Sequence, residues 1–582
     1  MDNPNLPGVQ DYIITTTAGT YAFTGLAPGS YVVKETQPLG YTSISDADTT
    51  PDDSGSPAAP ANISATDNRL PVHVGAGETD SGNDFVERAP KPTDFTTWAT
   101  WSGLSGQDAA ALPGPTGVGG NPDGDRFNNL LEFALCFPPQ SGINPGCPYE
   151  IRITPAGRID FAITYGNALT DLTFTLQVVG ELGSPAEWTM AEGLPSSTTD
   201  NGNGTSTLVY QDLESLGAAY ADGDGFVRVQ IGLDTNADNE PDLFDYTEAA
   251  GWTDHEHPGD LRPGNPLVRD LCTTFSMPYL KCAVLSCTAN GNTATSIDLT
   301  DSVGAFSVAG ALDPGRRYFV EITGGALEGH RFEVNVASST ATSLALQAVS
   351  QVNTRSLTAG ELTGSRLVVR ELWTWNELFP PAAFQGGESS GDSDALLLHD
   401  GTAWRSCFLV DLGGGDKRWV LDGDWTLADQ GAEIIAPCEG LFVHRRGPSL
   451  TIARSGLVRD NNFAKPLPGT GCVLVGSGYP MPQSYTSRFM SVDSGWRGDV
   501  DLAFSSQVLF WLGDTIPGKL CYSTDFLLDA GFSPLQFWAS ADDSALTIKN
   551  GLPLFKGTGA AFHCLPIALP NYVVPAQWYS SP

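Results

Sequence analysis

The sequence predicts an all-β fold of tandem β-sandwich (Ig-like) domains, interrupted by one short helical segment. Short runs of alternating apolar and polar residues recur along the chain, and clusters of turn residues separate them, as expected for half-buried strands. Glycine (65 residues) and proline (41 residues) make up about 18% of the chain, above the usual ~12% and below the ~25–30% typical of disorder. At roughly 100–200 residues per domain, the 582 residues correspond to three to five domains.

The composition is acidic because basic residues are scarce. Lys and Arg number 30 against 67 Asp and Glu, which gives a formal net charge of −37 although only 17% of positions are charged. A nucleic-acid-binding protein would present a basic face, so the composition excludes that class. No stretch reaches the roughly 18 apolar residues of a membrane-spanning helix, and we expect no membrane span.

The ten cysteines predict an oxidising compartment. Their number is even, their spacings are irregular and no CxxC motif occurs, which favours disulfides over zinc ribbons and thiol-redox sites. Cys136 and Cys147 flank the turn-forming segment FPPQSGINPG, which would bring their Cα atoms within bridging distance, so we predict a disulfide between them. The N-terminus, MDNPNLPGVQ, lacks the features of a signal peptide. We therefore expect a piece of a longer exported protein, extracellular or on the cell surface, whose natural start is not Met1.

Residues 1–89 form the first predicted domain, with the strand-like runs YIITTT, TYAFTGL and SYVVKET. The run YAFTGLAPGSYVVKETQPLGY and the closing GNDFV resemble the B domains of serine-aspartate-repeat and collagen adhesins of Gram-positive bacteria. In the collagen-adhesin relatives, the Glu that matches Glu35 promotes an isopeptide bond, for which Asn83 or Asp84 would be the acceptor. The only Lys before residue 90 is Lys34, beside Glu35 on the same strand, so the donor is missing.

Such domains also begin with one or two strands that this chain lacks. A sandwich without its first strands leaves an open sheet edge with which another chain can pair. We therefore expect a strand from a neighbouring copy, or from a removed upstream segment, to complete the domain. Copies of the chain itself are the expected partner.

Residues 90–148 form a predicted linker that contains the sequence NPDGDRFNNLLE. Numbered from Asn121, oxygen-bearing side chains stand at positions 1, 3, 5 and 12 (Asn121, Asp123, Asp125 and Glu132), and the Phe127 carbonyl stands at position 7. This is the spacing of an EF-hand loop, whose hard oxygen ligands suit Ca²⁺. The LLEFAL segment supplies a short helix that would carry Glu132 back to the ion. The alternative is an Asn/Asp/Gly turn that caps a helix.

The same stretch resembles the calcium loops of thrombospondin type 3 repeats and dockerins, which implies Ca²⁺ as the cofactor. Arg126 stands where those loops usually have Gly, and Asn121 replaces their usual first Asp. A second metal site is predicted at Asp234, Asn236 and Asp238, whose oxygen-bearing side chains alternate; a solvated loop is the alternative reading there.

Residues 149–268 and 269–370 are predicted as two further β domains. At least five strand-like runs lie between residues 149 and 232, at the spacing typical of a sandwich. The order of a tryptophan segment, the NPDGD loop and this sandwich resembles a module of large exported proteins of verrucomicrobial and planctomycete-like bacteria. The segment from Leu312 to Val334 resembles an uncharacterised family of verrucomicrobial exported proteins, over about residues 270–580. These resemblances imply an address outside the cell and no particular activity.

An internal repeat predicts two related β units, residues 371–470 and 471–582. LLLHDGT before Cys407 matches FWLGDT before Cys521, with the Asp seven residues ahead of the Cys in both. Matched disulfides, Cys407 with Cys438 and Cys521 with Cys564, would staple the two units.

The sequence contains no convincing catalytic motif, and we expect that the protein is not an enzyme. The one GxSxG string, Gly387–Gly391, lies in a polar loop without the strand and helix of a nucleophile elbow. Seven tryptophans of the C-terminal half suit either core packing or a sugar-stacking platform: Trp373, Trp375, Trp404, Trp419, Trp425, Trp511 and Trp538.

These observations predict an extracellular structural protein, the subunit of a surface filament or matrix that polymerises by strand complementation. The alternative is an adhesin that binds surface glycans, with tryptophans exposed in a shallow groove. A carbohydrate-active enzyme is a distant third reading, because it needs two carboxylates that converge in a deep cleft.

Overall fold

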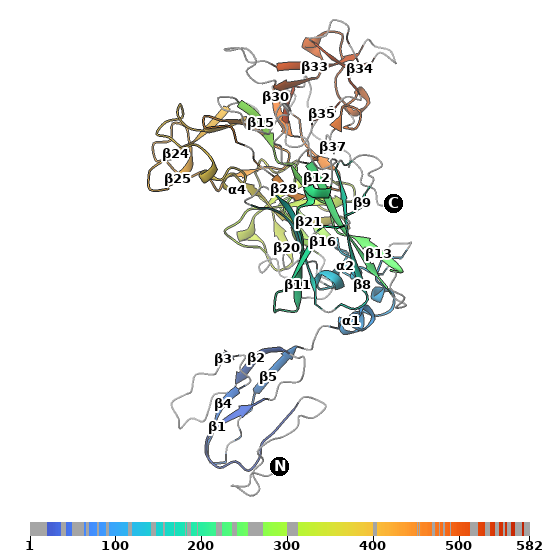
Figure 1. Ribbon diagram of the computed structural model, residues 1–582, viewed down its shortest axis with the longest axis vertical. Coiled ribbons are helices and arrows are strands. Elements are labelled where there is room, and N and C mark those ends of the chain that lie inside the picture. The colour runs from blue at the N-terminus through green and yellow to red at the C-terminus, as the bar shows by residue number, and fades with distance from the viewer. Residues whose placement is uncertain are drawn as a thin grey trace. The chain divides into compact units, whose positions relative to one another are not determined.

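The structure is a computed structural model that describes residues 20–574 with internal gaps, the longest at 49–62, 254–271, 300–311 and 512–521. The chain divides into two compact units, residues 1–92 and 93–582. Strands dominate both units, and they form antiparallel sheets, so the predicted all-β class is confirmed (Figure 1).

The first unit contains two small sheets among its described residues. One pairs β1 with β4, and the other places β2 between β3 and β5. Half-buried and exposed residues alternate along β1, the pattern of a strand with one covered face. Leu70 and Val72 of β4 are buried, whereas Val32 of β1 is 61% exposed. The strands are β1 (Gly29–Lys34), β2 (Thr42–Asp48), β3 (Ile63–Ala65), β4 (Arg69–Val74) and β5 (Asn83–Arg88).

The second unit begins with two short α-helices and two sheets. A four-stranded sheet has the order β10-β11-β7-β6, and a six-stranded sheet has the order β28-β14-β12-β8-β9, with β13 also paired to β12. The elements are α1 (Phe95–Trp101), α2 (Asn129–Leu135), β6 (Tyr149–Ile153), β7 (Ile159–Gly166), β8 (Leu172–Val179), β9 (Thr189–Met190), β10 (Ser196–Asp200), β11 (Thr205–Tyr210), β12 (Asp224–Leu233), β13 (Leu243–Tyr246), β14 (Ala250–Thr253) and β28 (Arg454–Leu457).

A second six-stranded sheet follows, with the order β19-β18-β21-β16-β17-β20. Its strands are β16 (Ala283–Asn292), β17 (Ser296–Leu299), β18 (Tyr318–Gly324), β19 (Arg331–Val334), β20 (Ser343–Ala345) and β21 (Arg366–Glu371). Apolar side chains of this sheet, among them Leu285, Val320 and Val369, pack into a core of their own.

The two segments of the internal repeat form five-stranded sheets with the same connectivity. The first has the order β15-β27-β23-β24-β25 and a β22-β26 pair; the second has the order β30-β36-β32-β33-β34 and a β31-β35 pair. The strands of the first are β15 (Cys272–Ser276), β22 (Trp373–Thr374), β23 (Ala395–His399), β24 (Trp404–Asp411), β25 (Lys417–Leu421), β26 (Ile434–Ile435) and β27 (Gly440–His444). Those of the second are β30 (Cys472–Gly476), β31 (Gln483–Ser484), β32 (Gln507–Trp511), β33 (Tyr522–Asp529), β34 (Gln536–Ser540), β35 (Pro553–Phe555) and β36 (Ala560–Cys564).

Side-chain contacts repeat together with the strand order. Trp419 on β25 and Trp538 on β34 are the middle residues of matching strands, and both are buried. Trp419 Nε1 donates a hydrogen bond to Phe379 O (3.0 Å), and Trp538 Nε1 donates one to Met490 O (2.6 Å). The matching tryptophan of each repeat unit thus donates to a backbone carbonyl between the second and third strands of that unit.

The units of the repeat do not follow the predicted domain boundaries. The first strand of the first repeat unit is β15. The whole β16–β21 sheet is therefore inserted within this repeat unit, between β15 and β22. β14, from the predicted 149–268 domain, pairs with β28, from the predicted 371–470 unit. Residues 93–582 are therefore one compact unit with interleaved sheets and not a string of separate domains.

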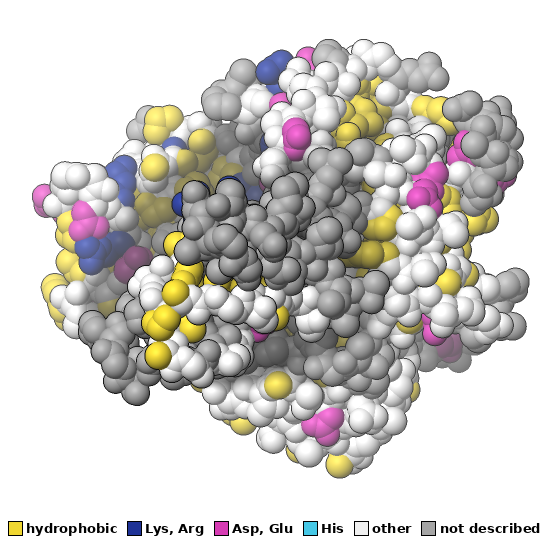
Figure 2. All heavy atoms as spheres, turned by 90° about the horizontal axis from the view of Figure 1, so that it is seen from below, with side chains coloured by type: hydrophobic (Ala, Val, Ile, Leu, Met, Phe, Trp, Pro, Cys, Tyr) yellow, Lys and Arg dark blue, Asp and Glu magenta, His cyan; other side chains and the backbone are white. Residues whose placement is uncertain are grey.

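Short elements complete the described chain. They are the helix α4 (Trp375–Leu378), the 3₁₀ turns η1 (Gly106–Ala109), η2 (Leu213–Leu216), η3 (Val336–Ser338), η4 (Pro381–Ala383), η5 (Val492–Ser494) and η6 (Leu502–Phe504), and the pair β29 (Phe463–Ala464) and β37 (Val573–Val574). Where Figure 2 colours the described residues, Asp and Glu side chains lie scattered among neutral ones.

Candidate metal centre

The loop that precedes α2 folds around its own polar side chains. Asn121 Oδ1 accepts a hydrogen bond from the Gly124 N–H (2.9 Å), and Asn121 Nδ2 donates to Asp125 O (2.9 Å). Gly124 has φ +70°, a conformation that favours glycine. The Phe127 N–H donates to Asp125 Oδ1 (2.6 Å). The NPDGD sequence therefore makes a tight turn that turns its two Asp side chains inward.

The helix α2 fixes the third carboxylate. Asn128 caps the helix by accepting from the Leu131 N–H (3.1 Å), which places Glu132 in the first turn. All seven residues of α2 are buried, and Asn129 Nδ2 anchors the helix to Asp108 O (2.6 Å) and Ala110 O (2.7 Å). Glu132 is consequently held in the protein interior, where its side chain has little freedom to turn toward solvent.

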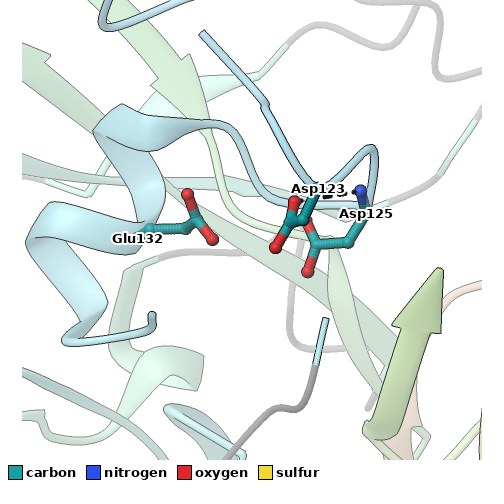
Figure 3. Close-up of side chains that lie close together, drawn as sticks. All are labelled: Asp123, Asp125 and Glu132. Carbon is teal, nitrogen blue, oxygen red and sulfur yellow. Dashed lines mark hydrogen bonds between the residues drawn. The ribbon is translucent and has the colours of Figure 1, made fainter. Parts of the chain in front are cut away.

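The three carboxylates converge on one point. Oxygen atoms of Asp123, Asp125 and Glu132 all lie within 4.8 Å of one another. Figure 3 shows Glu132, on the helix, pointing across toward the two Asp side chains of the loop. Glu132 is 1% exposed and Asp125 is 6% exposed. Both carboxylate oxygens of Glu132 are buried without a hydrogen-bond partner in the described part of the chain.

The electrostatics of this cluster oppose its ionisation. Burial raises the pKa of Glu132 well above its ordinary value, and the charges of Asp123 and Asp125 raise it further. Burial also raises the pKa of Asp125, as does the charge of Asp123. Three negative charges in a dry site repel one another and lack solvation, so the arrangement calls for a proton or a cation. A cation that accepts hard oxygen ligands fits the donor set, and Ca²⁺ is such an ion.

The charge of Arg126 acts to lower the pKa of Asp125, but the Arg126 side chain forms its ion pairs with carboxylates outside the cluster. Its Nη2 atom lies 2.7 Å from Glu248 Oε1 and 2.6 Å from Asp460 Oδ2. Glu248 in turn accepts from Tyr149 Oη (2.8 Å) and Arg370 Nη2 (3.2 Å). Arg126, which stands where calcium loops usually have Gly, thus links the loop to two distant connecting segments, after β13 and after β28. The spacing of polar residues in the loop does not predict these partners of Arg126, which lie more than 100 residues away in the sequence.

The other predicted ligands are placed as follows. Asn121 braces the turn with its amide, and Phe127 packs its ring against Phe137, with centroids 5.0 Å apart. Of the predicted second metal site, Asn236 and Asp238 lie outside the described residues, and the Asp234 N–H donates to Asp171 O (2.8 Å). The second site therefore stays a prediction.

The predicted Cys136–Cys147 disulfide is wrong. Cys147 is bonded to Cys282, with an S–S distance of 2.00 Å and Cα atoms 5.5 Å apart. Cys136 ends helix α2 in the left-handed conformation at φ 62°, and its backbone N–H donates to Glu132 O. The cap of α2 thus sets the direction in which the chain leaves the helix at Cys136, and the partner of Cys147 is the distant Cys282.

The predicted Cys407–Cys438 disulfide is also wrong. Both are buried thiols without a disulfide. Cys407 lies on β24, and Cys438 lies just before β27; the strand β23 separates β24 from β27 in the sheet. Cys472 is disulfide-bonded, and Cys521, which we expected to pair with Cys564, lies outside the described residues.

Of the seven tryptophans, three pack in the core, and the side chain of Trp511 lies outside the described residues. Trp375, Trp419 and Trp538 are buried, and Trp373 is half-buried with its Nε1 donating to Tyr279 O (3.0 Å). Two further rings reach solvent: Trp404 is 50% exposed and Trp425 is 96% exposed. Glycan binding at these rings remains a prediction.

In the GxSxG loop, the Ser389 hydroxyl donates to Asp392 Oδ2 (2.9 Å).

Among the described residues, no helix is both long and apolar enough to cross a membrane. The chain matches no protein-family model, and no curated protein or solved structure is significantly similar to it.

Proposed function

We propose that this chain is an extracellular structural protein whose larger unit is held together by a bound Ca²⁺ ion at Asp123, Asp125 and Glu132. The observation that carries the proposal is the buried Glu132 carboxylate, which faces two further carboxylates and has no hydrogen-bond partner among the residues that the structure describes. A buried ionised carboxylate without a partner is strongly unfavourable, and a bound divalent cation removes that cost.

The proposed location outside the cell rests on the disulfide, on the calcium site and on the sequence resemblances. Disulfides persist in oxidising compartments, and the chain contains the Cys147–Cys282 bond. Calcium sites of extracellular modules bind with dissociation constants of about 10⁻⁴–10⁻³ M, so a calcium site is compatible with a location outside the cell. The resemblance of residues 1–89 to adhesin B domains and of the remainder to exported proteins supports this location.

Replacement of Glu132 by Gln tests the metal site. In the presence of a chelator, Glu132→Gln should raise the free energy of unfolding by about 1–3 kcal/mol, because the variant no longer buries an unpartnered charge. With saturating Ca²⁺, we expect wild-type protein to gain about 3 kcal/mol and the variant to gain almost nothing. The measurement is denaturant-induced unfolding with and without Ca²⁺, and Glu388→Gln, at an exposed Glu, is the control.

The pH dependence provides a second readout of the same experiment. The ordinary pKa values of Asp125 and Glu132 are 3.8 and 4.5, and both are raised in the folded chain. Their stabilising effect is therefore complete at low pH and is lost as the pH rises through the folded-state pKa values. Without metal, wild-type protein should be less stable at pH 7.5 than at pH 5, and the gain from Ca²⁺ should be larger at pH 7.5. Equal gains for wild-type protein and Glu132→Gln would refute the site.

We also propose that copies of the chain polymerise by strand addition at the first unit. Among the described residues, β1 and β4 form a sheet of two strands, and Val32 of β1 is 61% exposed, so this sheet is the proposed place of strand addition. Electron microscopy of the full chain in Ca²⁺ should show filaments. Val32→Lys should abolish them, because lysine on an edge strand blocks pairing, whereas Val349→Lys, at a valine that is 93% exposed in the larger unit, should not. Dispersed wild-type monomers would contradict the proposal.

A further inference from the structure

The strand β16 lies against the loop that carries the metal cluster. Alternate residues of β16 point into the core of its own sheet, and these are Leu285, Cys287 and Ala289. Because successive side chains of a strand point to opposite faces, Ser286 and Thr288 share the other face. A Cβ atom added to Gly124 of the loop would lie 3.3 Å from Thr288 Oγ1. The face of β16 that carries Ser286 is therefore the face that meets the loop.

Gly142 brings Ser286 and Asp125 to the same place. The Ser286 N–H donates to Gly142 O (2.8 Å). A Cβ atom added to Gly142 would lie 1.5 Å from Ser286 O and 3.5 Å from Asp125 Cβ. One residue without a side chain thus separates the backbone of Ser286 from the side chain of a carboxylate of the cluster.

The Ser286 hydroxyl has no hydrogen-bond partner within the described chain, although Ser286 is only 1% exposed. A buried hydroxyl without a partner is unfavourable, and such groups are rare in native proteins. The same is true of both Glu132 oxygens. Buried oxygens without a partner in the described chain therefore occur on helix α2 and on strand β16, and both elements adjoin the loop.

We propose that Ser286 Oγ is a further ligand of the metal ion, an inference that rests on the proposed calcium site. Ca²⁺ takes six to eight oxygen ligands, more than three carboxylates supply when some bind through one oxygen only. A hydroxyl adds a neutral hard oxygen and no further charge repulsion. With this ligand, the ion joins the loop at residues 121–125 to a strand more than 150 residues further along the chain. The ion then acts as a cross-link between distant segments and not only as the filling of a local loop.

Calorimetric titration of the full-length, metal-free protein with Ca²⁺ tests the role of Ser286. We expect Ser286→Ala to weaken Ca²⁺ binding about tenfold while leaving the melting temperature in chelator unchanged or higher, since an unpartnered hydroxyl is removed. Thr274→Val is the matched control, because Thr274 on β15 is also 1% exposed with an unpartnered hydroxyl. It should leave Ca²⁺ affinity unchanged.

A second variant tests proximity directly. Ser286→Cys replaces a hard oxygen by a thiol, so it should shift the preference of the site from Ca²⁺ toward Cd²⁺ by at least about tenfold, because thiolates select softer metals. Unchanged Ca²⁺ affinity of Ser286→Ala, together with an unchanged Cd²⁺ preference of Ser286→Cys, would overturn this inference and leave the three-carboxylate site intact. Failure of wild-type protein to bind Ca²⁺ would instead overturn the proposed function itself.

Discussion

Serine replacement of both Cys147 and Cys282 is expected to lower the free energy of unfolding of the larger unit by about 4 kcal/mol. The bond closes a loop with a sequence separation of 135 residues, and the chain entropy that a disulfide removes from the unfolded state grows with loop length. Chemical denaturation of the oxidised double variant and of oxidised wild-type protein measures the difference.

Cys136→Ser is the control for this prediction. Because Cys136 takes no part in the Cys147–Cys282 bond, its replacement should change the stability by less than about 1 kcal/mol. If Cys136 were the partner of Cys147, Cys136→Ser would be as damaging as Cys147→Ser, and Cys282→Ser would be harmless. Mass spectrometry of unreduced proteolytic peptides identifies the bonded pair independently.

Gly142→Ala should destabilise the larger unit by about 3 kcal/mol. The added Cβ would lie 1.5 Å from Ser286 O, so either the backbone of β16 or the backbone at residue 142 has to move. The backbone that clashes carries Ser286, and the added Cβ would also lie 3.5 Å from Asp125 Cβ, so the variant should also lose most of its stabilisation by Ca²⁺. Thermal unfolding with and without Ca²⁺ reports both effects.

Gly291→Ala offers the matched comparison on the same strand. The nearest atom to its added Cβ is Asp298 Oδ2, at 3.9 Å, which is an ordinary contact. We expect a change of less than about 1 kcal/mol there and a full response to Ca²⁺. Similar losses in the two variants would show that the close approach at Gly142 has no special role.

The sequence predicts the features of this protein that depend on neighbours along the chain. Asp123, Asp125 and Glu132 converge because a short turn and the first turn of a capped helix suffice to bring them together. The all-β class follows in the same way from local alternation and turn residues.

Features that depend on long-range pairing were not predictable. Cys147 has a partner 135 residues away, and Arg126 has one 334 residues away, in Asp460. The short separation of Cys136 and Cys147 in sequence favoured pairing them, but the bonded partner of Cys147 comes from a distant part of the chain. Spacing alone carries no information about which distant strand, β16 in this case, lies beside the loop.

The insertion of the β16–β21 sheet has a consequence for folding. β15 pairs with β27, although the entire inserted sheet lies between them in the sequence. β30, the first strand of the second repeat unit, lies much nearer to β27 in sequence. Loop-closure entropy therefore favours β30 as the first strand to reach β27, although its native partner is β36. In the native arrangement β15 and β30 instead meet at their ends, where a Cβ atom on Gly476 of β30 would lie 2.3 Å from Ser276 Cβ of β15. The absent side chain of Gly476 thus lets the two related strands, each paired in its own sheet, approach one another closely.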